Sequence, residues 1–236
     1  MEKPKILIQT EKWAVIFKPA GMATQLSDDS KGSSLEYYLK QELQKDTVYF
    51  PHRLDRITQG LLLVAFDKET VAYYNDEIKN KKISKYYLAK VESKIPDILN
   101  LIGIHKRFIK IDDKISRIVK SGGLPSFLEI LAIEPAPESP ECYHVLVKLL
   151  TGRMHQIRVM FADMGIPLCG DFLYNPDSKD KAFYLESIIL SFNDPEGLRK
   201  TFFCEGNLNR NMVGEKMKSR IEEISEVKYG QSNSNC

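Results

Sequence analysis

Hydrophobic positions along the chain follow two periods, which divide it into predicted strands and helices. Residues 6–17 alternate around Thr10-Glu11-Lys12, a pattern typical of two short strands joined as a hairpin. Residues 60–66 read GLLLVAF, a continuous apolar run of strand length, which predicts a central strand covered on both faces. Residues 33–45 carry apolar side chains at helical spacing behind Ser33 or Ser34 as a cap.

Helices and strands stay mixed in the rest of the chain. Residues 68–83 are predicted to form a helix, and residues 84–93 a strand. Further elements are expected as paired strands at 127–137 and 143–150, a helix within 151–165, a loop at 166–174, a strand at 187–192 and an amphipathic helix within 212–228. Because the two kinds of element do not strictly alternate, the predicted fold class is α+β, with a mixed, mainly antiparallel central sheet flanked by helices.

Composition and charge change this picture little. The 236 residues are 43% hydrophobic and 28% charged, an ordinary globular balance. The formal net charge is only +2, so any binding of nucleic acid must depend on local basic patches. Three candidate patches interleave cations with apolar residues: KNKKISK (79–85), HKRFIK (105–110) and KISRIVK (114–120).

The sequence favours a cytoplasmic protein without membrane contact. Met1 leads into EKPK rather than into the apolar stretch of a signal peptide. No apolar run approaches the roughly 20 residues that a membrane-spanning helix needs. The four Cys include no CxxC pair, so free thiols in a reducing compartment are expected.

Motifs for several common chemistries are missing from the sequence. There is no GxGxxG, no GxxxxGK[ST] and no GxSxG, so dinucleotide, P-loop and serine-hydrolase sites lack support. A zinc site from His52, His155 and a carboxylate is conceivable, but no HExxH or HxE…CxxC spacing accompanies these residues. We therefore predict no metal.

Two segments about a hundred residues apart each combine His and Arg with a glycine turn. They read HRLDRITQG (52–60) and TGRMHQIR (151–158). An Asp held near an Arg stays ionised and, with no His base nearby, can act as a direct nucleophile. Alternatively, Asp55 forms a structural ion pair and helps to set the TQG corner. The residues alone leave both interpretations open.

The first segment resembles HRLDxxTSGLLL, the active-site motif of the RluA family of pseudouridine synthases. Four other stretches resemble the KPAG, KxYxAxV, TGRxHQIRxHLxxxGxPIxGDxxY and LHAxxLxFxHP blocks of that family, in the same order. They are VIFKPAGM (15–22), SKYYLAKV (84–91), TGRMHQIRVMFADMGIPLCGDFLY (151–174) and FYLESIILSFNDP (183–195). The ordered set covers roughly residues 6–203 and strongly indicates a catalytic domain of this family.

This resemblance implies an enzyme that isomerises specific uridines in structured RNA, either rRNA or tRNA, to pseudouridine without a cofactor. Asp55 matches the catalytic Asp of the family, which is proposed to attack either the ribose or the uracil ring. Arg158 matches the residue that pairs with this Asp, and Tyr87 matches a Tyr expected to stack on the base. Both routes need an anionic Asp in a pocket that excludes water.

The other matching residues would bind the substrate or support the site. Arg53 matches an Arg that family members insert where the flipped nucleotide had been, because a uridine reacts only after extrusion from the stack. Leu185 matches an apolar residue that packs near the base. Supporting roles are predicted for four further motif residues: His52 and His155, counted with the substrate-binding set, and Lys18 and Asp171.

The sequence departs from the family pattern at a few positions. Gln59 replaces the usual Ser before Gly60, and Met160 replaces the usual His after HQIR. The chain opens almost directly on the KPAG block, so no N-terminal S4 RNA-binding domain is expected. We predict a catalytic domain at residues 1–205, a C-terminal helix and polar tail at 206–236, and a monomer that binds an RNA stem-loop.

Two rival functions stay open at this point. An RNA-folding or ribosome-assembly factor could keep the fold with little catalysis, although the intact set of Asp55, Tyr87 and Arg158 disfavours it. A hydrolase that uses Asp55 and Asp171 as paired carboxylates is the weaker alternative.

Overall fold

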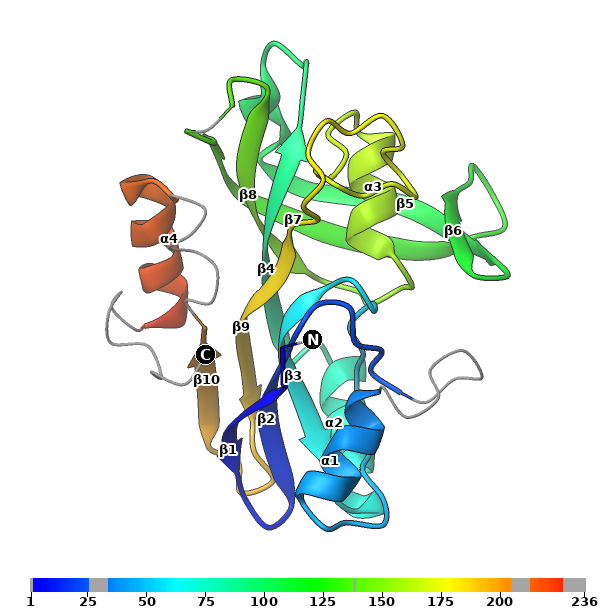
Figure 1. Ribbon diagram of the computed structural model, residues 1–236, viewed down its shortest axis with the longest axis vertical. Coiled ribbons are helices and arrows are strands. Elements are labelled where there is room, and N and C mark those ends of the chain that lie inside the picture. Colours follow the sequence, from blue (N-terminus) through cyan, green and yellow to red (C-terminus); the bar gives the residue numbers. More distant parts are fainter. Residues whose placement is uncertain (1, 26–33, 138, 205–212, 227–236) are drawn as a thin grey trace. The chain divides into compact units, whose positions relative to one another are not determined.

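The computed structural model describes residues 2–25, 34–137, 139–204 and 213–226, and Figure 1 shows their elements. The chain divides into two compact units. The first contains the described parts of 1–84 and 186–206, and the second contains those of 85–185 and 207–229. The sequence predicts a catalytic domain at 1–205 and a helix with a polar tail at 206–236; this functional division stays a prediction.

The first unit is built on strands from both ends of the chain. They are β1 (Lys5–Gln9), β2 (Trp13–Lys18), β3 (Gln59–Ala65), β9 (Leu185–Asn193) and β10 (Arg199–Phe203). β1 and β2 form the predicted hairpin, in which Thr10 Oγ1 accepts a hydrogen bond from the Trp13 N–H at 2.9 Å. β2 pairs antiparallel with β3, β3 pairs parallel with β9, and β10 pairs antiparallel with β9.

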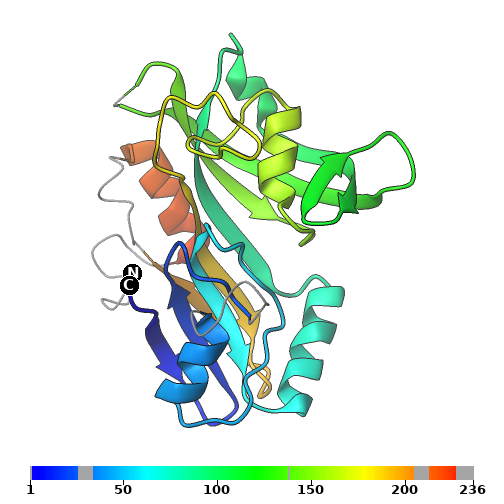
Figure 2. The ribbon, with the colours of Figure 1, turned by 45° about the vertical axis from the view of Figure 1, so that its right-hand side comes forward.

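Two helices cover the strands of this unit. α1 (Leu35–Glu42) begins behind Ser34, whose Oγ accepts from the Tyr37 N–H, and α2 (Lys68–Lys79) begins behind Asp67, which accepts from the Thr70 N–H. Figure 2 shows both helices along the strands. The side chains of residues 61–65 are fully buried, so β3 is covered on both faces as predicted.

The second unit is a sheet in the order β4-β8-β7-β5-β6, in which each neighbouring pair is antiparallel. The strands are β4 (Ser84–Glu92), β5 (Gly103–Asp112), β6 (Ile115–Ile118), β7 (Leu124–Pro135) and β8 (Cys142–Leu149). A short 3-10 helix, η1 (Ile98–Leu101), precedes β5. β5 and β6 occupy the stretch 95–123, for which the sequence pattern indicates no clear element.

Two helices belong to the second unit, α3 (Gln156–Asp163) and α4 (Glu215–Ser225). α4 is the helix predicted within 212–228, and its buried face carries Met217 and Ile221. Glu134 of β7 caps it, because its carboxylate accepts from the Gly214 and Met217 N–H groups at 2.5 and 3.3 Å. This helix is therefore anchored to the sheet of the second unit.

The predicted fold class is confirmed. Among the strand pairings within the two units, β3–β9 is the one parallel pair in the described part of the chain. β10 is an element that the sequence pattern did not indicate. Cys142 and Cys169 are free and buried, whereas Cys204 is disulfide-bonded, so the expectation of free thiols is wrong for that residue. No helix in the described ranges is long and apolar enough to cross a bilayer.

Candidate active site

Asp55 lies on a half-buried turn of the first unit, and the backbone on both sides of it is fixed. On one side, Thr24 Oγ1 donates to the Leu54 carbonyl at 2.8 Å and accepts from the Leu54 N–H at 3.3 Å. On the other side, the Gly21 N–H donates to the Arg56 carbonyl at 2.8 Å, and Arg56 Nε donates to the Gly21 carbonyl at 3.0 Å. The segment from Lys18 to Thr24 thus holds the turn that presents Asp55.

Lys18 is a fully buried cation in the same segment. Its Nζ donates to the carbonyls of Pro19 and Met22 at 2.9 and 2.8 Å, and to that of Arg56 at 3.4 Å. Burial lowers the pKa of Lys18 to about 7, and the charge of Asp55 opposes this shift. Lys18 therefore closes the turn, and its protonated form supplies a positive charge close to the candidate carboxylate.

The end of the turn is joined directly to β9. Gly60 has φ +116°, and a Cβ at this position would lie 2.3 Å from the Ser187 carbonyl oxygen. Only glycine allows that conformation and this approach of the two strands. Beside it, Gln59 Nε2 donates to Oε2 of the buried Glu186 at 3.1 Å. Gln59, which departs from the family pattern, thus links the Asp55 turn to β9.

His52 and Arg53 are adjacent in the sequence but differ in exposure. His52 is buried, and its Nε2 accepts a hydrogen bond from the Leu63 N–H at 3.2 Å, which ties the segment to β3. Arg53 is exposed. The geometry of His52 is that of an anchoring residue, whereas Arg53 is open to a ligand.

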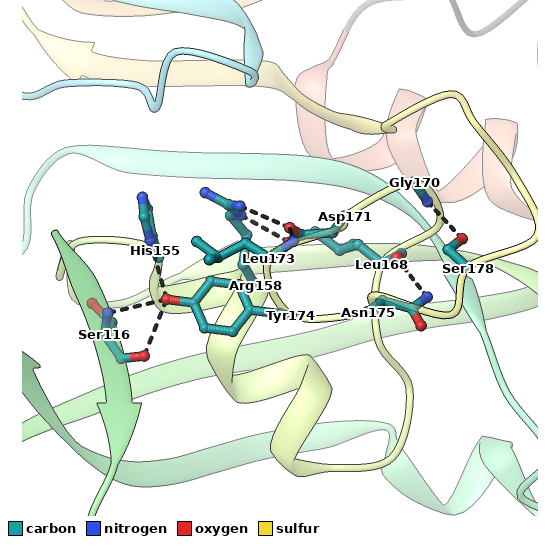
Figure 3. A network of polar contacts seen from close by, with 10 residues as sticks. All are labelled: Ser116, His155, Arg158, Leu168, Gly170, Asp171, Leu173, Tyr174, Asn175 and Ser178. Atoms are coloured by element: carbon teal, nitrogen blue, oxygen red, sulfur yellow. Dashed lines mark hydrogen bonds and ion pairs between the residues drawn. The ribbon is translucent and has the colours of Figure 1, made fainter.

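In the second unit, Arg158 on α3 is held by a carboxylate (Figure 3). Its Nε and Nη2 donate to the two oxygens of Asp171 at 2.8 and 2.7 Å, and both side chains are buried. This two-point geometry fixes the plane of the guanidinium as well as its position. The rings of Tyr174 and Phe183 lie 5.2 and 5.7 Å from Arg158 Cζ.

Tyr174 connects this ion pair to α3 and to β6 (Figure 3). Its hydroxyl accepts from the Ser116 N–H and donates to the Ser116 carbonyl, both at 3.0 Å, and lies 3.1 Å from His155 Nδ1. His155 begins α3 in a left-handed conformation with φ 51°. Sequence reasoning missed Tyr174 and Ser116. Tyr174 could have been predicted, because it ends the GDFLY stretch of a motif. Ser116 could not, because it contacts Tyr174 only through backbone atoms, which every residue has.

Tyr87 is buried on β4, opposite Val147 of β8. Its neighbour Tyr86 is half-buried, and Lys148 Nζ lies 5.5 Å from the centre of the Tyr86 ring. The two tyrosines therefore point to opposite faces of the strand, as predicted. Leu185, at the start of β9, is also buried.

The residues with described positions include no group of three His, Cys, Asp or Glu side chains that could hold a metal ion. The geometry disfavours the hydrolase alternative. Both oxygens of Asp171 are taken by Arg158, an arrangement that suits an orienting carboxylate rather than one of two hydrolytic carboxylates.

Comparison with known proteins decides the family. The family model described as RNA pseudouridylate synthase matches residues 12–163. The chain belongs to this family. One relative, the tRNA pseudouridine synthase C from Haemophilus ducreyi, is 30% identical to this chain over 212 residues, which cover 83% of this chain and 87% of that protein. The RluA type predicted from the sequence is confirmed.

Other members of the family are similar to most of this chain but are covered by it to different extents. An uncharacterised RNA pseudouridine synthase from Haemophilus influenzae is 28% identical, covering 80% of this chain and 82% of that protein. RNA pseudouridine synthase 6, chloroplastic, from Arabidopsis thaliana is 26% identical over 74% of this chain, which spans 41% of that protein. Human RNA Pseudouridylate Synthase Domain Containing 1 has the same fold, with a TM-score of 0.70, 22% identity, and coverage of 87% of this chain and 84% of that one.

The RNA pseudouridylate synthase match contains every predicted site residue except Leu185 and Asp171. Asp55, Tyr87 and Arg158 lie within it, as do Arg53 and the two His. Leu185 lies beyond it, as do Asp171 and Tyr174, which fix Arg158. The side chains that orient Arg158 therefore come from a segment outside the family match.

Proposed function

We propose that this RNA pseudouridylate synthase isomerises specific uridines in structured RNA, with Asp55 as the nucleophile. Asp55 would form a bond to the ribose or to the uracil ring while the bond between C1′ and N1 breaks. The detached base turns, a bond forms between C1′ and C5, and the bond to Asp55 breaks. C5 loses its proton and N1 gains one. No atom is gained or lost in the isomerisation, so the reaction needs no co-reactant.

The fixed backbone at Asp55 is the observation that carries this proposal. Hydrogen bonds to Leu54 and Arg56, on either side of Asp55, hold the turn without using the carboxylate in those contacts. Catalysis is faster when a reacting group is held in position before the substrate binds. A turn with a fixed backbone therefore suits a nucleophile better than a residue that only shapes a turn. The same feature supports the catalytic interpretation over the structural ion pair.

We assign Arg158 and Tyr87 the roles that their motifs imply. Arg158 would keep the Asp55 carboxylate charged, and its two hydrogen bonds to Asp171 support this role because they fix the guanidinium beforehand. Tyr87 would stack on the base and assist the loss of the proton. Arg53, exposed on the Asp55 segment, would fill the space that the flipped uridine leaves.

The RNA would be held by exposed cations of the second unit. Lys106 and Lys110 on β5, and Lys114, Arg117 and Lys120 on and around β6, are exposed. Arg107 is less exposed and is paired with Asp163 at 2.5 Å, while the exposed Lys110 lies 3.6 Å from an oxygen of Asp112. We infer a substrate in the class of tRNA or rRNA stem-loops, and the H. ducreyi relative, whose name specifies tRNA, supports the first of these.

Mapping of pseudouridine in RNA from cells with and without the gene tests the proposal. We expect one or a few uridines to remain unmodified without the gene, and to be restored by the wild-type protein but not by Asp55→Asn. The Asp55→Asn protein should still bind RNA, which separates catalysis from binding. Asp76→Asn, at an exposed position of α2, is the matched control and should restore modification. A wild-type protein that modifies no cellular RNA would contradict the proposal.

A further inference from the structure

Lys85 is a second buried cation, and none of the contacts above involves it. It is 7% exposed and lies on β4, two residues before Tyr87. Because Tyr86 pairs with Lys148 of β8, Lys85 lies next to the end of β8 and the turn that follows it. Its Nζ is 3.6 Å from the position that a Cβ on Gly152 would occupy.

Lys85 has no anionic partner in the part of the chain that the structure describes. Neither a hydrogen bond nor an ion pair joins its Nζ to those residues. Burial alone lowers the pKa of Lys85 to about 8, with no carboxylate acting against it. In this Lys85 differs from Lys18, which donates to three carbonyls and lies near Asp55. The Nζ itself is not enclosed, so the stem of Lys85 is buried while its amino group is open to an anionic ligand.

Arg153 contributes a second unused donor at the same turn. It directly follows Gly152, and its Nε is buried with no hydrogen-bond partner among the residues of the described ranges. The neighbouring Arg158 instead has its Nε on a carboxylate of the protein. Two cationic side chains without protein partners therefore adjoin Gly152, where the absence of a side chain leaves room for a ligand to approach the backbone.

The turn between these two cations is rigid. The buried Gln156 accepts from Thr151 Oγ1 at 2.8 Å and from the Arg153 N–H at 3.0 Å. Its Nε2 donates to the Phe127 carbonyl at 2.9 Å, and Thr151 Oγ1 accepts from the Phe127 N–H at 2.8 Å. Such a turn keeps its geometry before a ligand arrives, which reduces the entropy lost on binding.

We propose that Lys85 and Arg153 bind one backbone phosphate of the substrate RNA at the Thr151–Arg153 turn. Lys85 and Tyr87 share a face of β4 and are two residues, or about 6.6 Å, apart along the strand. The phosphate is therefore that of the nucleotide whose base Tyr87 contacts, or of its direct neighbour. The inference rests on the proposed function, since it assigns part of the same substrate.

The salt dependence of RNA binding tests this site. Wild type, Lys85→Met and Arg153→Gln are titrated with a structured RNA substrate from low to moderate salt. Each variant should bind about tenfold more weakly at low salt, and the slope of log K against log salt should fall by about one. Lys85→Arg should keep the wild-type affinity and the wild-type salt slope. Lys216→Met, which removes an exposed cation of α4, should keep the wild-type slope.

Kinetics distinguish a phosphate contact from a role in the chemistry. A phosphate contact is made before and during the reaction, so Lys85→Met should raise KM and leave kcat unchanged. A fall in kcat with unchanged RNA affinity overturns the proposal, and so does a folded Lys85→Met protein with the affinity and salt slope of wild type. If Lys85→Met fails to fold, Arg153→Gln decides by the same criteria.

Two further results separate the possible sources of the phosphate and the two proposals. If inorganic phosphate stabilises wild type more than Lys85→Met, but the two bind RNA equally, the site takes a free ion and the proposal is wrong. Wild type could modify no RNA and still lose salt dependence of RNA binding when Lys85 is replaced. This result would support the phosphate site and contradict only the proposed isomerase activity.

Discussion

The turn that carries Asp55 and the helix that carries Arg158 are fixed by different means. The turn at Asp55 is held by hydrogen bonds to the backbone of Leu54 and Arg56. Arg158 is held by side chains, because Asp171 binds the guanidinium at two points and Tyr174 packs against it. The position of the turn is therefore sensitive to changes that alter the path of the backbone. The position of the arginine is sensitive to substitution of the side chains that contact it.

Gly60 offers the strongest test of the backbone side of this comparison. In Gly60→Ala the new Cβ would meet three backbone atoms of Ser187 at 2.3 to 2.8 Å, in a residue with φ +116°. Since neither strand can move without breaking the β3–β9 pairing, we expect a loss of about 5 kcal/mol or more in the free energy of unfolding. Denaturant unfolding, or failure to obtain folded protein, measures this effect.

Gly21→Ala is the matched control for the Gly60 change. Gly21 also has a positive φ, +84°, but a Cβ there would meet no atom within 4 Å. Only the conformational strain applies, which costs about 1–2 kcal/mol. Equal losses in the two variants would show that strain alone accounts for Gly60, and that its close approach to Ser187 is unimportant.

Asp171→Asn tests the side-chain half of the comparison. The substitution keeps the shape of the side chain but removes the charge of the carboxylate that the buried Arg158 binds at two points, which should lower the free energy of unfolding by about 3 kcal/mol. Modification of RNA should fall further than this loss explains, because the guanidinium is no longer fixed. Denaturant unfolding and single-turnover assays on folded protein separate these two effects.

Asp163→Asn breaks a comparable pair that is only half-buried. Asp163 binds Arg107, and both side chains are about one third exposed. Solvent screens such a pair, so we expect a change of no more than about 1 kcal/mol. A similar loss in both Asp variants would contradict the view that burial sets the importance of the Arg158 pair.

The same contrast explains how much of the molecule the sequence could predict. Hydrophobic periods identified α1, α2 and α4, with a predicted serine cap for α1, and strand alternation placed Tyr86 and Tyr87 on opposite faces. β5 and β6 escaped prediction because several of their apolar side chains are exposed, including Ile104 at 67%. Apolar residues on the solvent side blur the alternation from which a strand is recognised.

Contacts that fix the candidate site were harder to predict than its residues. The motif order indicated Asp55 and Arg158, but the Gln59–Glu186 pair joins positions 127 residues apart, and Tyr174 binds backbone atoms of Ser116 from 58 residues away. Backbone donors and acceptors are present at nearly every position, so the sequence does not indicate which of them a side chain selects.

Lys18 distinguishes the two regions by pH. Arg158 keeps its charge at any ordinary pH, whereas burial lowers the pKa of Lys18 from 10.5 to about 7 in the folded protein. Between these two values the unfolded chain holds more protons at Lys18 than the folded one. The free energy of unfolding should therefore rise with pH in this window, by at most about 1.4 kcal/mol per pH unit from this residue.

Lys18→Met removes this contribution while the Lys85 contribution stays the same. Urea unfolding of both proteins at pH 7, 8 and 9 should show a shallower rise of stability in the variant. Lys68→Met, at an exposed position of α2, should follow wild type. Parallel curves for wild type and Lys18→Met would mean that the three carbonyls around Lys18 Nζ keep it charged throughout. The backbone-held turn would then be as insensitive to pH as the carboxylate-held arginine.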